Sequence, residues 1–76
     1  MKKIKLIWDF RGIDAFKTAE HHVIHLKEFS KKQNLDETES GISKQNDVHC
    51  CAFITVLEKD MILVRDALRP HRGEIA

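Results

Sequence analysis

The sequence lacks any long apolar run. Its 76 residues include one proline, three glycines and no tyrosine, and no stretch approaches the roughly 20 apolar residues that a membrane-spanning helix needs. The N-terminal stretch MKKIKLIWDF is interrupted by Lys5 and Asp9 and has no small-residue cleavage site, unlike a secretory signal peptide. The sequence therefore predicts a cytoplasmic protein with no membrane partner.

An excess of charge of one sign is also absent. Thirteen basic and twelve acidic residues leave a net charge of +1, which provides no general field to attract nucleic acid. No repeat, linker or low-complexity segment divides the chain, so we expect a single α+β domain over residues 1–76. A chain of this length buries only about 60% of its unfolded surface. A second subunit would bury more, and we expect a homodimer.

The two cysteines are adjacent, Cys50 and Cys51. A strand would point their thiols to opposite faces, and the CxxC spacing of a zinc site is absent. We interpret both as small buried hydrophobic residues. The sequence also shows no serine or cysteine beside a base with an orienting acid, no phosphate loop and no close carboxylate pair. These absences make an enzyme the weaker hypothesis, and we expect no cofactor.

What the sequence does contain is a series of segments whose hydrophobic residues recur at the spacing of a strand or of a helix. Alternation over KKIKLIWDF predicts a strand with one buried face. A 3.6-residue period then predicts a helix over residues 13–33, with Asn34 as a left-handed cap. Its apolar stripe is expected to contain Phe16, Ala19, Val23 and Leu26.

The second half of the chain contains further strand and helix patterns. ETESGIS is typical of an exposed edge strand with a bulge at Gly41, and KQND predicts a hairpin turn. Residues 48–57 are apolar on both faces and predict a central strand covered on both sides. A helix is expected over residues 58–69, ended by Pro70. The stretch HRGEI leaves room for a very short last strand.

The predicted order is β-α-β-β-α, with a possible short final strand. This order indicates an α+β fold in which a small antiparallel sheet carries two helices on one face, the ferredoxin-like arrangement. The stretches LIWDFRG, AEHHVIHLKEF and VRDALRPHRGE also resemble small bacterial proteins of this architecture. The resemblance implies the fold and carries over no activity and no catalytic residue.

Three histidines gather in AEHHVIHLKEF. His21, His25 and Glu28 are spaced i, i+4 and i+7, so they share one helix face, and two histidines four apart can bind one metal ion. However, the motif is not HExxH, and the third ligand lies a turn too far for compact coordination. We therefore expect a solvated face with His22 half buried, and no dedicated metal site.

A second group of residues comes together if the fold is ferredoxin-like. The end of the first strand, the start of the third and the end of the second helix then share one edge, which would carry Arg11, His49, Arg69, His71 and Arg72. Guanidinium groups and a helix start suit carboxylate and phosphate, so we predict an anion-binding edge. Three carboxylates nearby could neutralise it, namely Asp9, Asp14 and Glu74. Alternatively, RPHRG only caps a helix end.

These observations leave three hypotheses for the function. The first is a small homodimeric binding or regulatory module whose arginine- and histidine-rich edge recognises a small anionic ligand or an acidic partner segment. The second is a small cofactor-free enzyme that uses a histidine at that edge as a general base. The third is a structural protein-interaction module.

Overall fold

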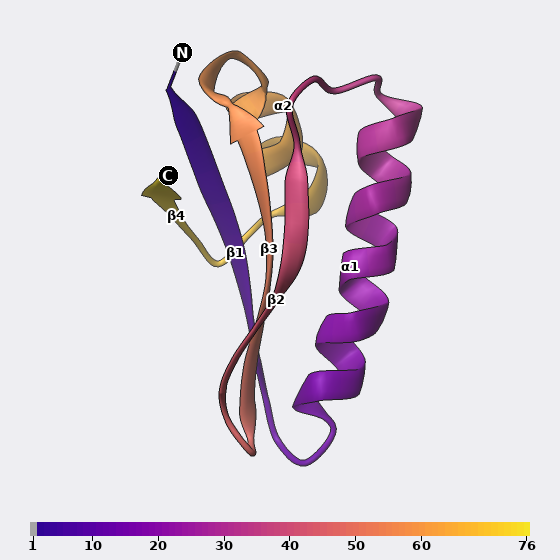
Figure 1. Ribbon diagram of the computed structural model, residues 1–76, viewed down its shortest axis with the longest axis vertical. Helices are drawn as coiled ribbons and strands as arrows, with labels where there is room; N and C mark the ends of the chain where they lie inside the picture. Colours follow the sequence, from indigo (N-terminus) through magenta and orange to yellow (C-terminus); the bar gives the residue numbers. More distant parts are fainter. Residues whose placement is uncertain (1) are drawn as a thin grey trace.

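The chain forms one four-stranded sheet and two helices. The computed structural model describes residues 2–76, and Figure 1 shows how the elements are arranged. In chain order the elements are β1 (Lys3–Arg11), α1 (Ala15–Lys32), β2 (Glu39–Asn46), β3 (His49–Leu57), α2 (Glu58–Leu68) and β4 (Arg72–Ile75). The predicted α+β class and element order are confirmed, including the short last strand. Over the described residues, neither helix combines the length and apolar character that crossing a membrane requires.

The sheet has the strand order β2-β3-β1-β4, and every neighbouring pair is antiparallel. β1 and β3 are paired along their whole length, from Lys3 opposite Leu57 to Arg11 opposite His49. Because side chains alternate between the faces of a strand, this register puts the even-numbered residues of β1 and β3 on one face. The odd-numbered residues lie on the other.

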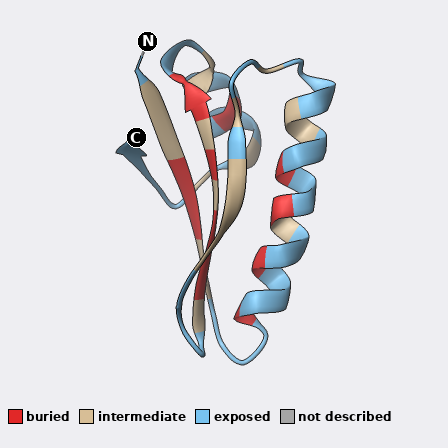
Figure 2. Ribbon diagram, in the orientation of Figure 1, coloured by how far each residue is buried: buried red, intermediate tan, exposed pale blue. Residues whose placement is uncertain are grey.

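Both helices cover the even-numbered face, and the core lies between them and the sheet. Leu26 of α1 and Val64 of α2 are fully buried with Ile54 and Val56 of β3. Figure 2 shows the same arrangement, with the buried positions on the two central strands and on the inner side of α1. The second face of β3 has no helix over it in the described part of the chain, so the expectation of two covered faces is met on one face only.

Helix α1 starts later than the predicted helix, and its buried face is rotated relative to the prediction. It begins at Ala15, and its buried stripe is Ala15, Ala19, Val23 and Leu26. The prediction of Phe16 in the stripe was wrong, because Phe16 lies one residue past Ala15 and is 46% exposed. The expected left-handed cap is confirmed, since Asn34 has φ of 53° just after the helix.

The bulge in β2 lies elsewhere than predicted. The register with β3 shifts between Lys44 and Asn46, not at Gly41. Gly41 instead lies opposite Phe53, where an added Cβ would come within 3.0 Å of the Phe53 Cζ atom. The glycine is therefore explained by the close approach of an aromatic ring and not by strand irregularity.

The end of α2 fixes the path into β4. Arg69 adopts the left-handed conformation with φ of 47°, and its N–H donates to the Arg65 carbonyl. The Trp8 indole donates to the Leu68 carbonyl over 3.0 Å, and the His71 amide donates to the Ile7 carbonyl over 2.9 Å. These bonds bring the residues after Pro70 alongside β1, so that Arg72 pairs with Ile7.

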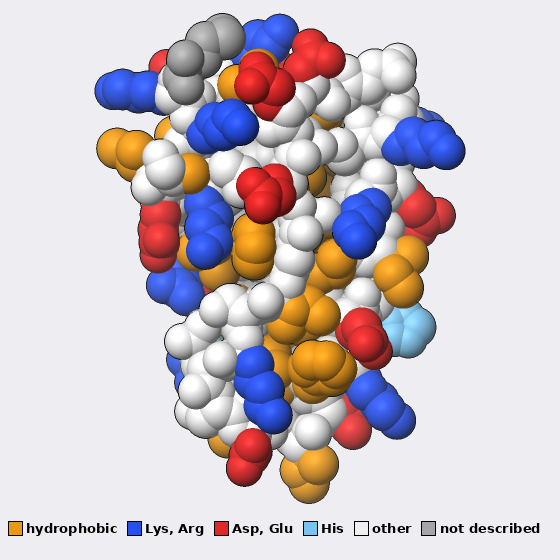
Figure 3. All heavy atoms as spheres, viewed as in Figure 1, with side chains coloured by type: hydrophobic (Ala, Val, Ile, Leu, Met, Phe, Trp, Pro, Cys, Tyr) orange, Lys and Arg blue, Asp and Glu red, His pale blue; other side chains and the backbone are white. Residues whose placement is uncertain are grey.

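Figure 3 shows the face of the molecule that carries β2 and α1. Hydrophobic side chains are visible along the seam between the sheet and the helix, and basic and acidic side chains are interspersed around them. This face therefore carries no extended surface of one charge, which agrees with the balanced composition of the chain.

Candidate polar site on the open sheet face

The face of the sheet away from the helices carries a cluster of polar side chains. The registers place Cys51 between Asp9 of β1 and Ser43 of β2, and place Ile7 between Phe53 of β3 and Arg72 of β4. Residues directly opposite one another on neighbouring strands share a face, and the odd-numbered residues of β1 and β3 lie on the open face. With His49 of β3, this face therefore combines acid, base, thiol and guanidinium groups from three strands.

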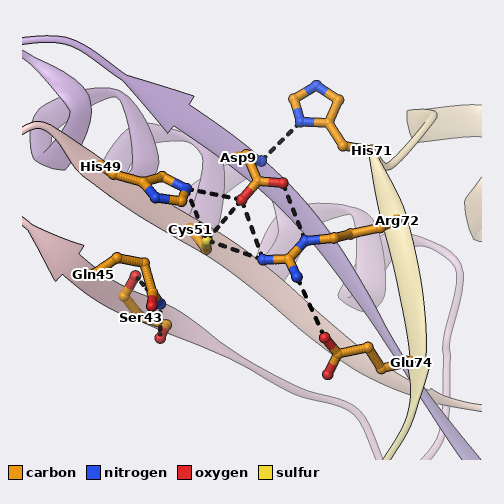
Figure 4. A network of polar contacts seen from close by, with 8 residues as sticks. All are labelled: Asp9, Ser43, Gln45, His49, Cys51, His71, Arg72 and Glu74. Atoms are coloured by element: carbon orange, nitrogen blue, oxygen red, sulfur yellow. Dashed lines mark hydrogen bonds and ion pairs between the residues drawn. The ribbon is translucent and has the colours of Figure 1, made fainter.

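Asp9 is the centre of this cluster, as Figure 4 shows. Its Oδ1 atom lies 3.0 Å from His49 Nε2 and accepts a bond of 3.0 Å from the Cys51 thiol. Arg72 donates to both carboxylate oxygens, from Nε to Oδ2 over 3.1 Å and from Nη2 to Oδ1 over 3.2 Å. This is the forked pairing that suits guanidinium to carboxylate. We call Asp9, His49, Cys51 and Arg72 the Asp9 cluster.

The contacts set the charge state of the cluster. Hydrogen bonds from Cys51, His49 and Arg72 hold the pKa of Asp9 well below its usual range, against the opposing effect of burial. Burial raises the pKa of the Cys51 thiol, and its bond to Asp9 raises it further. At neutral pH the cluster therefore contains a carboxylate, a protonated thiol and the Arg72 cation.

The structure corrects the sequence-based statement that no cysteine lies beside a base and an acid. Cys51 Sγ is 3.7 Å from His49 Nε2, and Asp9 contacts both. The order of contacts nevertheless differs from that of a nucleophilic triad, in which the acid binds the far nitrogen of the imidazole. Here the acid binds the thiol directly and favours its protonated form. The arrangement does not activate Cys51 as a nucleophile.

A hollow of about 200 Å³ adjoins the cluster on the open face. It is lined by Lys5, Ile7, Ser43, Gln45, Cys51, Phe53, Arg72 and Glu74. Lys5 Nζ lies 4.4 Å from the centre of the Phe53 ring, and Gln45 Nε2 donates to Ser43 Oγ over 2.8 Å. The hollow thus has an aromatic wall, two cationic side chains, the carboxylate of Glu74 and a pair of uncharged polar side chains.

The five residues of the predicted anion-binding edge lie in different surroundings. His49 and Arg72 both contact Asp9 on the open face. His71 also contacts Asp9, but through the backbone, since its Nδ1 accepts the Asp9 N–H over 2.8 Å.

The remaining two lie further away. Arg11 is opposite His49 at the end of β1 and is exposed, whereas Arg69 lines a separate hollow beside α2 with Arg65, Asp66 and Pro70. Arg72 is engaged not only by Asp9 but also by Glu74, to which Nη1 donates over 3.4 Å. Arg72 lies opposite Ile7, in the middle of β1, whereas Arg11 lies at the end of that strand, so the cationic groups do not converge on one point.

The histidines of α1 differ in exposure as the sequence predicts. His21, His25 and Glu28 are exposed, and His25 Nδ1 lies 3.8 Å from Glu28 Oε1. His22 is half buried, with its ring 4.7 Å from Trp8 and 5.5 Å from Phe10 between ring centres. Among the described residues its Nε2 has no hydrogen-bond partner, and burial lowers its pKa.

The group of atoms best placed to ligate a metal lies elsewhere, in the Asp9 cluster. One ligand atom each from Asp9, His49 and Cys51 lie within 4.8 Å of one another. Sequence analysis missed Asp9 and Cys51 as site residues. The signal that could have found them is the shared odd parity of Asp9, His49 and Cys51 on two strands predicted to be neighbours.

Comparison with known proteins adds no relative to this geometry. No protein-family model matches the sequence, and neither curated proteins nor solved structures give a match. The Asp9 cluster and the hollow beside it are therefore the features from which a function can be inferred.

Proposed function

We propose that this chain is a small binding module that holds a small anionic molecule in the hollow on the open face of the sheet. The observation that carries the proposal is the lining of the hollow, where Lys5 and Arg72 lie with the polar pair Ser43 and Gln45 beside the Phe53 ring. Pockets of this kind bind by a few placed polar groups on an apolar wall. The two cations favour a carboxylate or phosphate group.

Arg72 is the residue of this lining that the sequence also singled out. Its side chain is 48% exposed while Asp9 and Glu74 hold its guanidinium. Because both carboxylates hold it, the guanidinium is fixed in direction before any ligand arrives, which reduces the entropy lost on binding. The same carboxylates reduce its net charge, so we expect modest affinity and a preference for small ligands of low charge.

The test is a titration of the whole chain with inorganic phosphate and with succinate, followed by backbone amide shifts. We expect shifts at residues that line the hollow, with Lys5→Gln weakening binding by roughly tenfold or more, the equivalent of one charge-assisted bond of about 1.5–3 kcal/mol. Binding should also weaken with salt, since part of the attraction is screened.

Arg69→Gln is the matched control, because it removes a cation from the separate hollow beside α2. It should leave the affinity unchanged. Shifts centred on Arg69, or scattered evenly over the surface, would rule out the hollow as the binding site. Equal affinity in Lys5→Gln and the unmodified chain would do the same.

We further propose that the module is a homodimer joined through the edge strand β4. This strand lies at the end of the sheet, all four of its residues are exposed, and Ile75 is 76% exposed. Ala76 N–H donates to the Lys3 carbonyl, and the alternation of an antiparallel ladder then turns the N–H and C=O groups of Gly73 and Ile75 outward. Unpaired groups of this kind are templates for another strand.

The charges of β4 support pairing with a second copy. If two β4 strands pair antiparallel with Gly73 opposite Gly73, each Arg72 lies opposite a Glu74 of the other chain, and opposite charges across strands attract. Sedimentation at micromolar concentrations should then give a dimer. Gly73→Pro removes an outward N–H and should give a monomer.

The control for this experiment is Gly73→Ala. It keeps the N–H, and its added Cβ meets Leu6 Cδ2 at 3.4 Å, so it should stay dimeric. A monomeric unmodified chain contradicts the proposal, and a dimer that survives Gly73→Pro excludes β4 as the interface.

We also propose that the fold is ferredoxin-like and that the protein is cytoplasmic. The strand order β2-β3-β1-β4 and the two helices on one face support a ferredoxin-like arrangement. Two free cysteines support a reducing compartment such as the cytoplasm.

A further inference from the structure

The Asp9 cluster brings together three different metal-binding atoms. Asp9 Oδ1 lies 3.0 Å from His49 Nε2 and 3.0 Å from Cys51 Sγ, and the nitrogen and sulfur are 3.7 Å apart. The three residues come from the paired strands β1 and β3, where Asp9 is directly opposite Cys51. Their positions are therefore fixed by the backbone of the sheet rather than by a loop.

The spacing of these atoms fits a single ion of zinc type. Zinc binds nitrogen and oxygen at about 2.0–2.2 Å and sulfur at about 2.3 Å in tetrahedral geometry, so its ligand atoms lie roughly 3.3–3.6 Å from one another. The three distances in the cluster are 3.0, 3.0 and 3.7 Å, just below and just above that range. Imidazole with thiolate selects zinc and cobalt over magnesium and calcium, which prefer oxygen ligands alone.

Arg72 covers the same atoms. Its Nη2 lies 3.2 Å from Asp9 Oδ1 and 3.7 Å from Cys51 Sγ. The guanidinium therefore supplies a positive charge to two of the three candidate ligands. A metal ion bound to Asp9 Oδ1 would replace the contact that orients Arg72, and the 48% exposed side chain could then turn toward solvent.

We propose that Asp9, His49 and Cys51 form a three-ligand site for a zinc-type divalent ion and that Arg72 competes with the ion for Asp9 and Cys51. On binding, the Cys51 thiol loses its proton to solvent and the thiolate sulfur bonds to the metal, while His49 gives up its Nε2 proton to solvent, takes one up at Nδ1 and binds the metal through Nε2. Three protein ligands leave a fourth position for water or another ligand. This goes beyond the proposed anion binding and does not depend on it.

The test is a titration of the whole chain with Co²⁺, followed through the sulfur-to-cobalt charge-transfer absorption, with Zn²⁺ added afterwards as a competitor. We expect one equivalent to bind with this absorption and Zn²⁺ to abolish it. Cys51→Ser should lose the absorption. Cys50→Ser is the matched control, because it changes the adjacent cysteine on the other face of the sheet and should keep it.

Two further variants separate this site from an adventitious one. Arg72→Gln should bind Co²⁺ more tightly than the unmodified chain, because the competing cation is gone. A double variant of the exposed histidines, His21→Gln with His25→Gln, should bind as the unmodified chain does. Absence of the charge-transfer absorption in the unmodified chain, or its loss in the His21 and His25 variant, would overturn the proposal.

A measurement on the unmodified chain guards against variants that do not fold. Zn²⁺ should slow the alkylation of Cys51 by iodoacetamide, as located by peptide mass spectrometry. Both cysteines are buried and react only after the chain opens, so an ion that stabilises the native state also slows the reaction at Cys50. Protection of neither cysteine, or of Cys50 alone, contradicts the site. The phosphate titration is independent of this result, so a failed metal site leaves the hollow to be judged by Lys5→Gln.

Discussion

Cys50 and Cys51 are neighbours in the chain and equally buried, yet they lie on opposite faces of the sheet. Cys50 is 1% exposed and packs in the hydrophobic core beneath the helices. Cys51 is 2% exposed and donates its thiol proton to Asp9 on the face that no helix covers. Residue type and burial are therefore the same for both, whereas the face of the sheet and the residue opposite on β1 differ: Phe10 for Cys50 and Asp9 for Cys51.

The two faces are stabilised by different interactions. The helix-covered face is held by the burial of side chains such as Ile54 and Val64, which contributes in proportion to the apolar area removed from water. The open face is held by a cluster in which one carboxylate accepts bonds from His49, Cys51 and Arg72. Loss of an apolar side chain leaves a cavity, whereas loss of the carboxylate leaves several donors without a partner.

The largest effect is expected on the covered face. Ile54 is fully buried, so Ile54→Ala should lower the free energy of unfolding by about 2–5 kcal/mol through lost burial and a residual cavity. Urea denaturation measures it. Ile24→Ala, at an exposed position on α1, should change stability by no more than about 0.5 kcal/mol. Equal losses in the two variants would mean that the covered face is not the main source of stability.

A smaller loss is expected on the open face. Asp9→Asn keeps the shape but removes the charge that Arg72 and His49 contact, and should cost about 1–3 kcal/mol in the same assay. The control is Asp66→Asn, which breaks an exposed ion pair with Arg65 and should cost about 1 kcal/mol or less. If Asp9→Asn is as mild as its control, the Asp9 cluster is not a stabilising network.

A pH-dependent effect is expected at the border of the two faces, where His22 packs on Trp8 and Phe10. The pKa of His22 lies below its ordinary value of 6.5, mainly through burial and further through the positive charges of His25 and His71. As the pH falls below 6.5, the unfolded chain takes up a proton at His22 that the native chain does not. Stability should therefore fall with pH until the native pKa is reached.

The measurement compares urea denaturation at a series of pH values from about 7 down to 5, the range in which histidine titrates. His22→Leu should flatten the decline in stability, and His21→Gln, at an exposed position, should leave it unchanged. A decline that is the same in all three chains would assign the effect to other groups.

The smallest effect is expected on the outer side of α1. His21→Ala should change the free energy of unfolding by no more than about 0.5 kcal/mol, as for most surface positions. Zinc bound through this helix should also be lost on dialysis against a chelator, because His21, His25 and Glu28 are exposed and do not close around an ion. Stoichiometric zinc that is retained, and then lost in His21→Ala, would contradict this.

The fold could be predicted because the regular spacing of hydrophobic residues is a local property of the sequence. The alternation of Leu6 and Trp8 with Lys5 and Asp9 is visible in the sequence, and so is the helical spacing of Val23 and Leu26. The errors arose where the structure depends on the rotation of a helix about its axis or on the close approach of a side chain to the backbone. Phe16 falls one residue beyond the stripe, and the reason for Gly41 is the ring of Phe53.

The polar site could be predicted only in part, because its members lie far apart in the sequence. The direction of the strands correctly places Arg11 opposite His49. That Cys51 lies opposite Asp9 also requires the register, and a slip of one residue would pair Asp9 with the other cysteine. The position of Arg69 depends on a left-handed turn at the end of α2, which propensity alone does not specify.

The contact between Gly41 and Phe53 has a consequence for how the protein can diverge. The hollow is walled by the Phe53 ring, and the ring occupies space that any side chain at position 41 would enter. A single-codon change from glycine to alanine would push the ring toward Lys5 and Arg72 and narrow the hollow without touching a charged group. If the hollow holds an anion as we propose, ligand size could be selected at position 41 while the charged groups are inherited unchanged.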